Sequence, residues 1–289
     1  MSLRSDKALF NDAIQEYNYT FIYKNMVDWK EPMNFLTVAF THREILLNLV
    51  RKNLKGKYAG SVFGMLWVFI TPLLLALIVS FIFTKVMKMN IQHAYLFILA
   101  GWLPWNFFAG SLSEVVTSIP NNANMLKQFS MPRVLIPVSV VLANFTLLLA
   151  GLLITMPFFV VINPKAVLML PLLLAALFLH LFFTAGLSAM ISAIYVSFRD
   201  IGQLLNTLLL FWLWLTPVFY STDMIPSEYA AIFRFNPMTP YISLYRSALL
   251  YNGNACLGLL GIALPLSLAV GGAGFFVFHK HEKDFLKKI

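Results

Sequence analysis

One cluster of charged side chains in this sequence is entirely basic. Four cationic residues fall within seven positions: Arg51, Lys52, Lys55 and Lys57. Clustered Lys and Arg side chains bind phosphate groups, and next to a membrane they attract anionic lipid head groups. The net charge of +9 would also suit a nucleic-acid-binding protein. Because the basic residues of this chain cluster next to long apolar runs, we expect their partner to be a membrane surface and not a nucleic acid.

The sequence contains no motif typical of catalysis or of metal binding. It lacks the G-x-x-x-x-G-K-[ST] phosphate loop and the H-E-x-x-H metal helix. Its histidines are scattered, and the single cysteine, Cys256, leaves no intramolecular disulfide to propose. His180 lies alone in an apolar run, where an ionisable group is a functional candidate, but a hydrogen-bonded packing role fits it better. We therefore expect no catalytic residue, metal or cofactor in this chain.

The elements that must position these side chains are membrane-spanning helices. Six runs contain no Asp, Glu, Lys or Arg and together cover 151 of the 289 residues: 62–84, 94–113, 134–162, 166–198, 201–222 and 255–278. Each run is long enough to cross about 30 Å of hydrocarbon as a helix that rises about 1.5 Å per residue. Backbone polar groups in lipid must be paired within the segment. The sequence therefore predicts an all-α polytopic membrane protein with six transmembrane helices.

The distribution of charges predicts both the orientation of these helices and their energy source. With both termini in the cytoplasm, 16 Lys and Arg residues lie on the inner side and 5 on the outer side, as the retention of basic residues in the cytoplasm requires. No Asp or Glu lies inside the six runs, and Glu114 directly follows the second. Ion-driven carriers place carboxylates at mid-membrane, so we expect the energy source to lie on another polypeptide.

Residues 34–57 predict an amphipathic helix at the cytoplasmic membrane surface. At about 100° per residue, one arc of this helix holds polar residues, namely Glu44, Asn48, Arg51, Lys52 and Lys55. The opposite side is apolar, with Arg43 as the main exception, and holds Leu46, Leu49, Val50 and Leu54. We expect the apolar side to lie in lipid. The polar side is either a solvated face or a docking face for a cytoplasmic partner.

Three irregular segments complete the predicted fold. Pro120 and Pro132 bracket a cytoplasmic hairpin that is long enough for one short helix. The run 166–198 would reach about 50 Å as a single helix, so it must tilt, break or extend past the bilayer. Residues 225–250 combine prolines with short amphipathic pieces. This pattern predicts a re-entrant pair of half-helices on the outer side, before the last span.

Aromatic side chains are frequent in the first, second and fifth spans, and in the second Trp102, Trp105, Phe107 and Phe108 flank Pro104. The candidates for a functional role are Phe63, Trp67, Phe211, Trp214 and Tyr220. Trp and Tyr near membrane surfaces ordinarily form interfacial belts. Aromatic faces also stack on the apolar faces of pyranose rings, so a conduit for sugars is an alternative that the residues alone leave open.

Five segments of the sequence carry a family resemblance. They are the run RKNLKGKYAGSVFGMLW at 51–67 with the TPL at 71–73, GWLPWNFF at 101–108, FRDI at 198–201, TPVFY at 216–220 and NPMTP at 236–240. In order and spacing they resemble the ABC-2 type permeases of polysaccharide exporters. The likeness covers about residues 35–289, so we interpret 34–289 as an ABC-2 type transmembrane domain and 1–33 as a polar amino-terminal extension.

This resemblance implies the transmembrane subunit of an ATP-driven exporter of O-antigen, capsule or teichoic-acid chains in the bacterial inner membrane. In such families two permease chains pair with two separate ATPase chains, which would carry the ATP and Mg²⁺. The first and fifth spans would line a conduit at the dimer interface, and the re-entrant helices would cap its outer mouth. Its lining candidates are the aromatic set Phe63, Trp67, Phe211, Trp214 and Tyr220.

The resemblance also implies roles for polar side chains on the cytoplasmic side. The amphipathic helix and the hairpin would receive the stroke of the ATPase through Glu44, Arg51, Asn124 and Lys127. The basic cluster Arg51, Lys52, Lys55 and Lys57 would attract the diphosphate of a lipid carrier, or else would serve only topology and attraction to anionic lipids. The alternatives that remain are an ABC-2 exporter of drugs or small lipids, an ion channel without energy coupling, and an integral enzyme.

Overall fold

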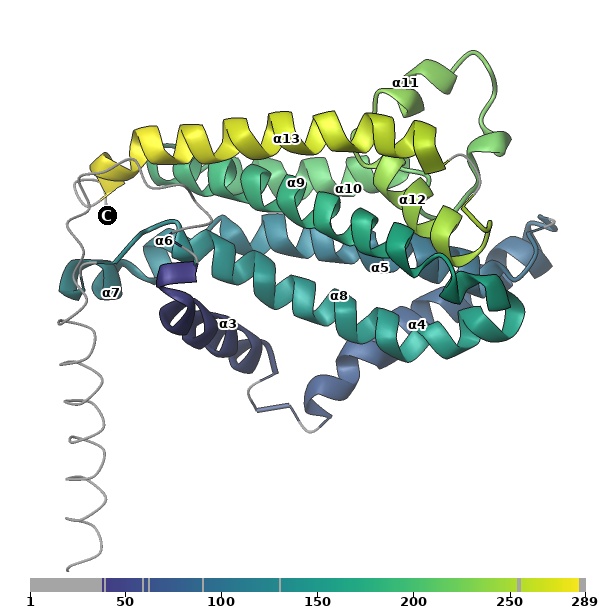
Figure 1. Cartoon of the computed structure of the whole chain (residues 1–289), viewed down its shortest axis with the longest axis horizontal. Coiled ribbons are helices and arrows are strands. Elements are labelled where there is room, and N and C mark those ends of the chain that lie inside the picture. Colours follow the sequence, from purple (N-terminus) through teal and green to yellow (C-terminus); the bar gives the residue numbers. More distant parts are fainter. Residues whose placement is uncertain are drawn as a thin grey trace, which may run out of the picture.

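The computed structural model describes residues 38, 40–58, 60–61, 63–89, 91–129, 131–253 and 256–285. The predicted extension 1–33 lies outside them. Every regular element among the described residues is helical. Five of these helices are long and apolar enough to cross a membrane: α4 and its π-helical continuation (Trp67–Val86), α5 (Ala94–Val115), α8 (Leu135–Ile162), α9 (Leu170–Ser197) and α13 (Cys256–His281). In Figure 1, α5, α8, α9 and α13 run side by side. The predicted all-helical membrane architecture is confirmed.

The predicted fifth span is shorter in the structure than in the sequence analysis. Helix α10 (Ile201–Leu215) has 15 residues, which corresponds to about 22 Å and falls short of a bilayer. Thr216 is extended, with φ −100° and ψ 132°, because the ring of Pro217 disfavours a helical conformation at the preceding residue. The prediction of one helix over 201–222 is therefore wrong, and only five complete helical spans occur among the described residues.

Two further helix boundaries differ from the prediction. The first span begins at Trp67 and not at residue 62, because a 3₁₀ turn (η1, Gly64–Leu66) precedes it. The fourth begins at Leu170 and not at residue 166, after a 3₁₀ turn (η3, Pro164–Val167). A proline in the first helical turn suits that start, since its missing N–H would have no partner there. The remaining helix has 28 residues, or about 42 Å, so it must still tilt or extend past a bilayer of about 30 Å.

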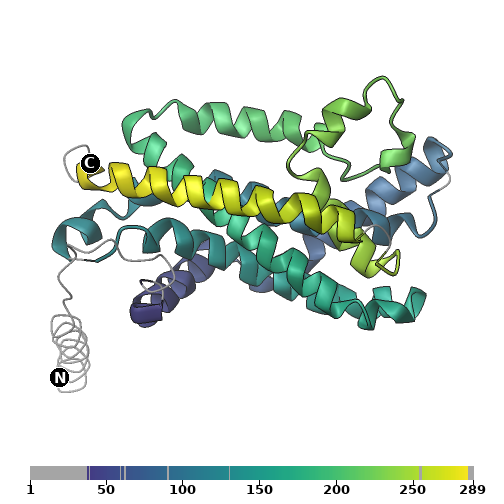
Figure 2. The same cartoon turned by 45° about the horizontal axis from the view of Figure 1, so that its top comes forward.

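Short helices gather at the two ends of the bundle. Helix α3 (Arg43–Tyr58) lies at the end where α13 finishes, together with α6 (Ser118–Asn121) and α7 (Ala123–Gln128). At the other end lies α11 (Ala230–Arg234), as Figures 1 and 2 show. The amphipathic helix and the hairpin predicted from the sequence thus share one end, and the predicted re-entrant segment lies at the opposite end.

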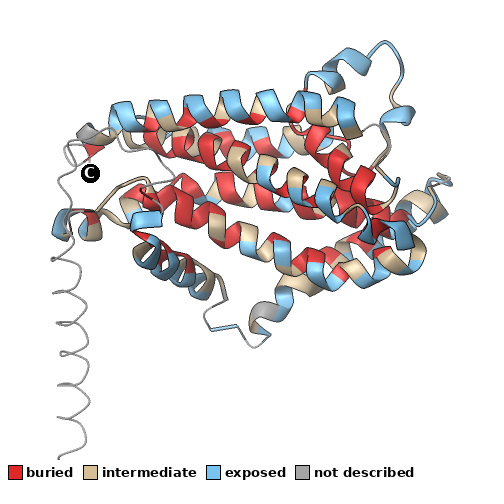
Figure 3. Ribbon diagram, viewed as in Figure 1, coloured by how far each residue is buried: buried red, intermediate tan, exposed pale blue. Residues whose placement is uncertain are grey.

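The two helices of the segment that was predicted to be re-entrant differ in environment. No residue of α11 is buried, whereas nine of the eleven residues of α12 (Thr239–Leu249) are buried. Helix α12 packs against α5, α9 and α13. Figure 3 shows that the interior of the bundle is buried, whereas the outer sides of helices such as α13 are exposed. A short helix is tolerated at membrane depth when protein surrounds it in this way.

The apolar side of α3 is covered by protein. Leu46, Leu49 and Val50 are each less than a tenth exposed. Leu46 and Leu49 form one apolar cluster with Leu135 and Val138 of α8. The expectation that this side lies in lipid is therefore wrong for these leucines and this valine, because the start of α8 occupies the place that lipid would take.

The backbones of helices α9 and α13 are in direct contact at glycine residues. A Cβ at Gly274 of α13 would overlap the backbone carbonyl of Gly186 in α9, and a Cβ at Gly186 would overlap the backbone of Gly271. Small residues permit such backbone contact between membrane helices, where van der Waals packing drives association. By contrast, a Cβ at Gly272 would meet nothing within 4 Å.

We predict that Gly274→Ala lowers the free energy of unfolding by about 1–3 kcal/mol, since the methyl group forces the two backbones apart. Gly272→Ala is the matched control, and it should be neutral or slightly stabilising. Thermal unfolding of both variants in detergent micelles, followed by circular dichroism, checks this. Equal midpoints for the two variants would contradict the close contact.

Candidate functional site

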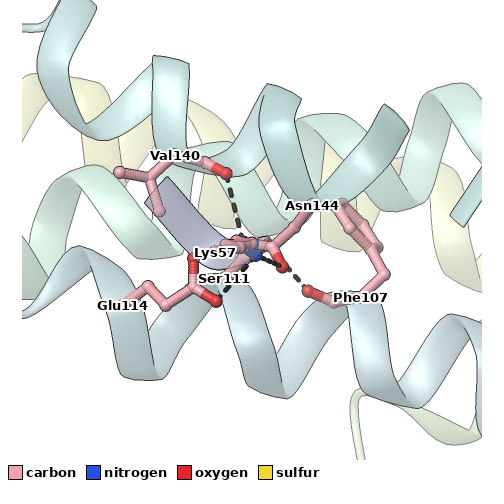
Figure 4. A network of polar contacts seen from close by, with 6 residues as sticks. All are labelled: Lys57, Phe107, Ser111, Glu114, Val140 and Asn144. Atoms are coloured by element: carbon pink, nitrogen blue, oxygen red, sulfur yellow. Dashed lines mark hydrogen bonds and ion pairs between the residues drawn. The ribbon is translucent and has the colours of Figure 1, made fainter. Parts of the chain in front are cut away.

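Three polar side chains form a closed network between α3 and the membrane helices (Figure 4). The Lys57 ammonium lies 2.7 Å from a Glu114 carboxylate oxygen and donates a 2.7 Å hydrogen bond to Oδ1 of Asn144. Asn144 in turn donates from Nδ2 to the other Glu114 oxygen at 3.0 Å and to the carbonyl of Val140 at 3.1 Å. Each member thus contacts both of the others.

The network joins three elements that are distant in the sequence. Lys57 lies in the last turn of α3, and Glu114 lies in the last turn of α5. Asn144 lies in α8, where it is 6% exposed. Charge-assisted hydrogen bonds are stronger than neutral ones, and burial of Asn144 limits competition from water. Because α3 precedes the first span and α5 is the second, the network links the amino-terminal helix directly to the bundle.

Two more polar contacts attach α3 to its neighbours. The Lys52 ammonium donates to Oδ1 of Asn122, between α6 and α7, at 2.8 Å. Asn53 donates from Nδ2 to the hydroxyl of Ser139 in α8 at 3.0 Å. Together with the leucine contacts, these bonds hold α3 against both α8 and the hairpin. The helix α3 is thus connected by side-chain contacts to the hairpin, to α8 and, through the network, to α5.

The four residues proposed to contact an ATPase remain accessible. Glu44 and Arg51 of α3 are exposed, as are Asn124 and Lys127 of α7. Met125 of α7 packs against the apolar cluster of α3 and α8, so the structure brings the two predicted contact segments together.

The structure separates the basic cluster into two kinds of residue. Arg51, Lys52 and Lys55 are exposed, whereas Lys57 is occupied by Glu114 and Asn144. Burial also lowers the pKa of His42, which precedes α3, so this imidazole adds no positive charge at neutral pH. The accessible positive charge on α3 therefore comes from the first three residues of the cluster and from Arg43, which is also exposed.

A pocket of about 240 Å³ lies beside the network, between α4, α5 and α8. Its lining combines aromatic rings with side-chain amides and includes Trp67, Trp102, Asn106 and Asn144. Asn144 belongs to both the pocket and the network. One wall of the pocket is therefore held by the contacts of Lys57 and Glu114.

The five predicted aromatic lining residues fall into two groups in one chain. Phe63 and Trp67 pack edge to face, with ring centroids 5.7 Å apart. Phe211 and Trp214 on α10 are 62% and 58% exposed. The hydroxyl of Tyr220 donates to the carbonyl of Trp214 at 2.5 Å. Among the described residues no ring contact joins the two groups directly.

Trp102 of α5 lies between these two groups. It shares the pocket with Trp67 and stacks on Phe219, with ring centroids 5.8 Å apart and planes at 22°. Phe219 also packs against Trp214 at 5.8 Å. Aromatic rings therefore extend from α4 across α5 to the end of α10. Trp67, Trp102 and Trp214 are partly accessible, whereas Phe219, which joins the last two, is buried.

His180 has the packing role that suits a lone membrane histidine. It is fully buried, its ring stacks on Tyr241 with centroids 5.0 Å apart, and Nδ1 lies 3.4 Å from the Tyr245 hydroxyl. The histidine helps to hold α9 against α12 and belongs to neither the pocket nor the network.

The sequence analysis did not name Glu114, Asn144 or Trp102 as site residues. A carboxylate at the end of an otherwise uncharged helix is a detectable signal for a fixed partner, because an ion at that depth is costly when unpaired. Asn144 is a polar residue inside a charge-free run, which is a weaker signal of the same kind. Which lysine pairs with Glu114 is a property of the fold alone.

We predict that Lys57 and Glu114 are energetically coupled. Lys57→Gln and Glu114→Gln should each destabilise the protein, and the double variant should lose less than the sum, with a coupling energy of about 1 kcal/mol. Lys55→Gln combined with Glu114→Gln is the matched control, because Lys55 is exposed, and its effects should be additive. Unfolding midpoints in detergent measure both cycles, and additive effects at Lys57 would disprove the pairing.

Comparison with known proteins identifies the family of this chain. Residues 45–250 match the family model described as ABC-2 type transporter. The chain is 30% identical over 246 residues to an O-antigen export system permease protein RfbA of Klebsiella pneumoniae, covering 84% of this chain and 93% of that protein. It is 28% identical over 263 residues to an RfbA of Myxococcus xanthus, covering 86% and 97%. This chain therefore belongs to the ABC-2 type transporter family, as a membrane-embedded transport subunit that works with an ATPase partner.

Proposed function

We propose that this chain is the permease subunit of an ATP-binding-cassette exporter that moves lipid-linked polysaccharide, specifically O-antigen, across the inner membrane. The observation that carries the proposal is the likeness to O-antigen export permeases over more than four fifths of the chain. The path of partly accessible aromatic rings through Trp67, Trp102 and Trp214 supports it. Indole faces bind the apolar faces of sugar rings without fixing one sequence of sugars.

In this proposal the work comes from two separate ATPase subunits that bind ATP and Mg²⁺, and two permease chains form the conduit. The exposed residues Glu44, Arg51, Asn124 and Lys127 at one end of the bundle form the docking face for the ATPase. The attachments of α3 to α5 and α8 carry its motion into the bundle. The exposed α10 aromatics, Phe211 and Trp214, face the second permease chain.

The same proposal places both chain termini and α3 in the cytoplasm. The count of 16 basic residues on that side and 5 on the other supports this orientation. The sixth crossing is then made by α10 together with the non-helical residues that follow it. The exposed Arg51, Lys52 and Lys55 lie at the inner leaflet, where they attract the diphosphate of the lipid carrier.

We predict that deletion of this gene in its source bacterium abolishes O-antigen on the cell surface and causes lipid-linked polysaccharide to accumulate inside. Export stops while synthesis continues, because the chain supplies the passage and not the polymer. Immunoblotting of surface and total polysaccharide measures both pools, with the restored wild-type gene as the control. Normal surface polysaccharide in the deletion strain would refute the proposed substrate.

We also predict that the double variant Lys52→Gln, Lys55→Gln reduces surface polysaccharide at least several-fold, since each cation near the membrane contributes about 1 kcal/mol of attraction to anionic head groups. Arg51 is left in place because it belongs to the proposed ATPase docking face. Lys85→Gln with Lys88→Gln, two exposed cations from the opposite end, is the control. Membrane levels of both variants and co-purification of the ATPase must remain unchanged. Export at the wild-type level in the Lys52, Lys55 variant would remove the head-group role.

A further inference from the structure

Backbone carbonyls at the end of α10 need hydrogen-bond partners from outside the helix. The helix stops at Leu215, and residues 216–221 continue without regular structure. The last carbonyls of a helix and those of an irregular segment have no helical partner. At membrane depth such a segment is tolerated only where protein satisfies its polar groups. The donors that do so here come from the segment that contains α11 and α12.

Arg246 of α12 supplies most of these donors. Its guanidinium donates to the carbonyls of Pro217 and Val218 at 2.6 Å each, and more weakly to Tyr220 at 3.4 Å and to Phe97 of α5 at 3.5 Å. The group also lies 3.5 Å from the centre of the Phe97 ring. Arg246 is only 5% exposed, so one cation is buried among four backbone carbonyls.

Asn236 supplies two further donor contacts. Its Nδ2 donates to the carbonyl of Leu215 at 2.8 Å and to the Thr216 hydroxyl at 2.9 Å. Its Oδ1 accepts from the Trp212 indole and from the backbone N–H of Met238, each at 2.9 Å. All four hydrogen-bonding positions of this amide are therefore used, three by partners on α10 or at its end and one by a partner at the start of α12.

The fold makes room for this arrangement at Gly101 of α5. A Cβ at this position would lie 2.7 Å from the Val218 carbonyl oxygen and 2.8 Å from Nη2 of Arg246. Both contacts are closer than real Cβ atoms show. Any side chain at residue 101 would therefore displace the guanidinium or the carbonyl that it holds.

The charge of Arg246 is not matched by a carboxylate. The two ion pairs that the structure shows among its described residues are Lys57–Glu114 and His279–Glu282, and neither includes Arg246. A planar guanidinium offers five N–H donors in a fixed fork, whereas a lysine ammonium is a point charge with three. Only arginine can therefore reach several carbonyls and stack on Phe97 at the same time.

We propose that Arg246, assisted by Asn236, is a positioning residue that clamps the broken outer end of α10 to α12 and α5. The clamp allows the fifth crossing to end as non-helical backbone and keeps the α10 end, α12 and α5 together as one unit. Because the aromatic residues Trp214, Phe219 and Tyr220 flank the clamped carbonyls, it also fixes the outer part of the proposed conduit. This last consequence rests on the proposed export function.

The first test measures the clamp without reference to transport. In the purified complex with its ATPase, in lipid nanodiscs, hydrogen exchange of the peptide covering 216–224 should accelerate at least about tenfold in Arg246→Lys, because the freed carbonyls open the segment. Arg234→Lys on the exposed α11 is the matched control and should leave exchange unchanged. Wild-type exchange in Arg246→Lys would overturn the clamp.

The second test asks whether the clamp serves export. Arg246→Lys and Gly101→Ala should each reduce surface polysaccharide at least about tenfold at normal membrane level, while the ATPase activity of the complex persists. Their combination should be no worse than the stronger single variant, since both act on one contact. Gly272→Ala is the control, because it also adds a methyl group to a helix but at a position where a Cβ meets nothing within 4 Å. Normal export in both variants would overturn the positioning role, whereas failure of the wild-type gene to export would instead refute the proposed function.

Discussion

The structure depends on one constraint, which is that hydrocarbon offers no partner for a backbone N–H or C=O group. Long helices meet the constraint internally, and five helices of 20 to 28 residues do so here. The difficult place is the end of α10, where the helix stops after 15 residues. There Arg246 and Asn236 replace the missing helical partners. At this end of the bundle, side-chain donors take the place of helical N–H groups as partners of the backbone carbonyls.

At the opposite end of the bundle, charged side chains attach α3 to its neighbours. Helix α3 has an exposed basic side and a side of leucines that α8 covers. Its last lysine turns away from water to pair with Glu114 and Asn144. A helix held by both apolar packing and a charged network moves together with its neighbours. This is the mechanical property that a subunit needs when its work is supplied by another chain.

A series of aromatic side chains lies between the two ends of the bundle. Trp67, Trp102, Phe219 and Trp214 come from α4, α5 and the end of α10, and they lie near one another through the pocket and two ring contacts. Arg246 holds the carbonyl of Val218, the residue before Phe219, and Asn144 of the network lines the same pocket as Trp67. The conduit candidates therefore lie between two polar anchors, one at each end.

The local features of the chain could be predicted from its sequence. Runs without charge predicted the membrane helices, since hydropathy and length act through the solvent that surrounds each segment. The polar pattern of 34–57 predicted α3, and five short motifs predicted the family. The run 166–198 was also expected to be too long for a vertical span, and α9 keeps 28 of its residues.

Tertiary structure alone decided which groups meet. Arg246 was counted among the outer charges, because a lone arginine in a polar-flanked helix gives no sign that carbonyls more than twenty residues away will surround it. Likewise, nothing local distinguishes Lys57 from Lys55, yet one is paired with Glu114 and the other is exposed. The sequence analysis assigned the apolar side of α3 to lipid. A leucine can be buried against lipid or against another apolar helix, and the sequence pattern is the same in both cases. Sequence determines what each segment can bury, and the packing of distant helices determines what covers it.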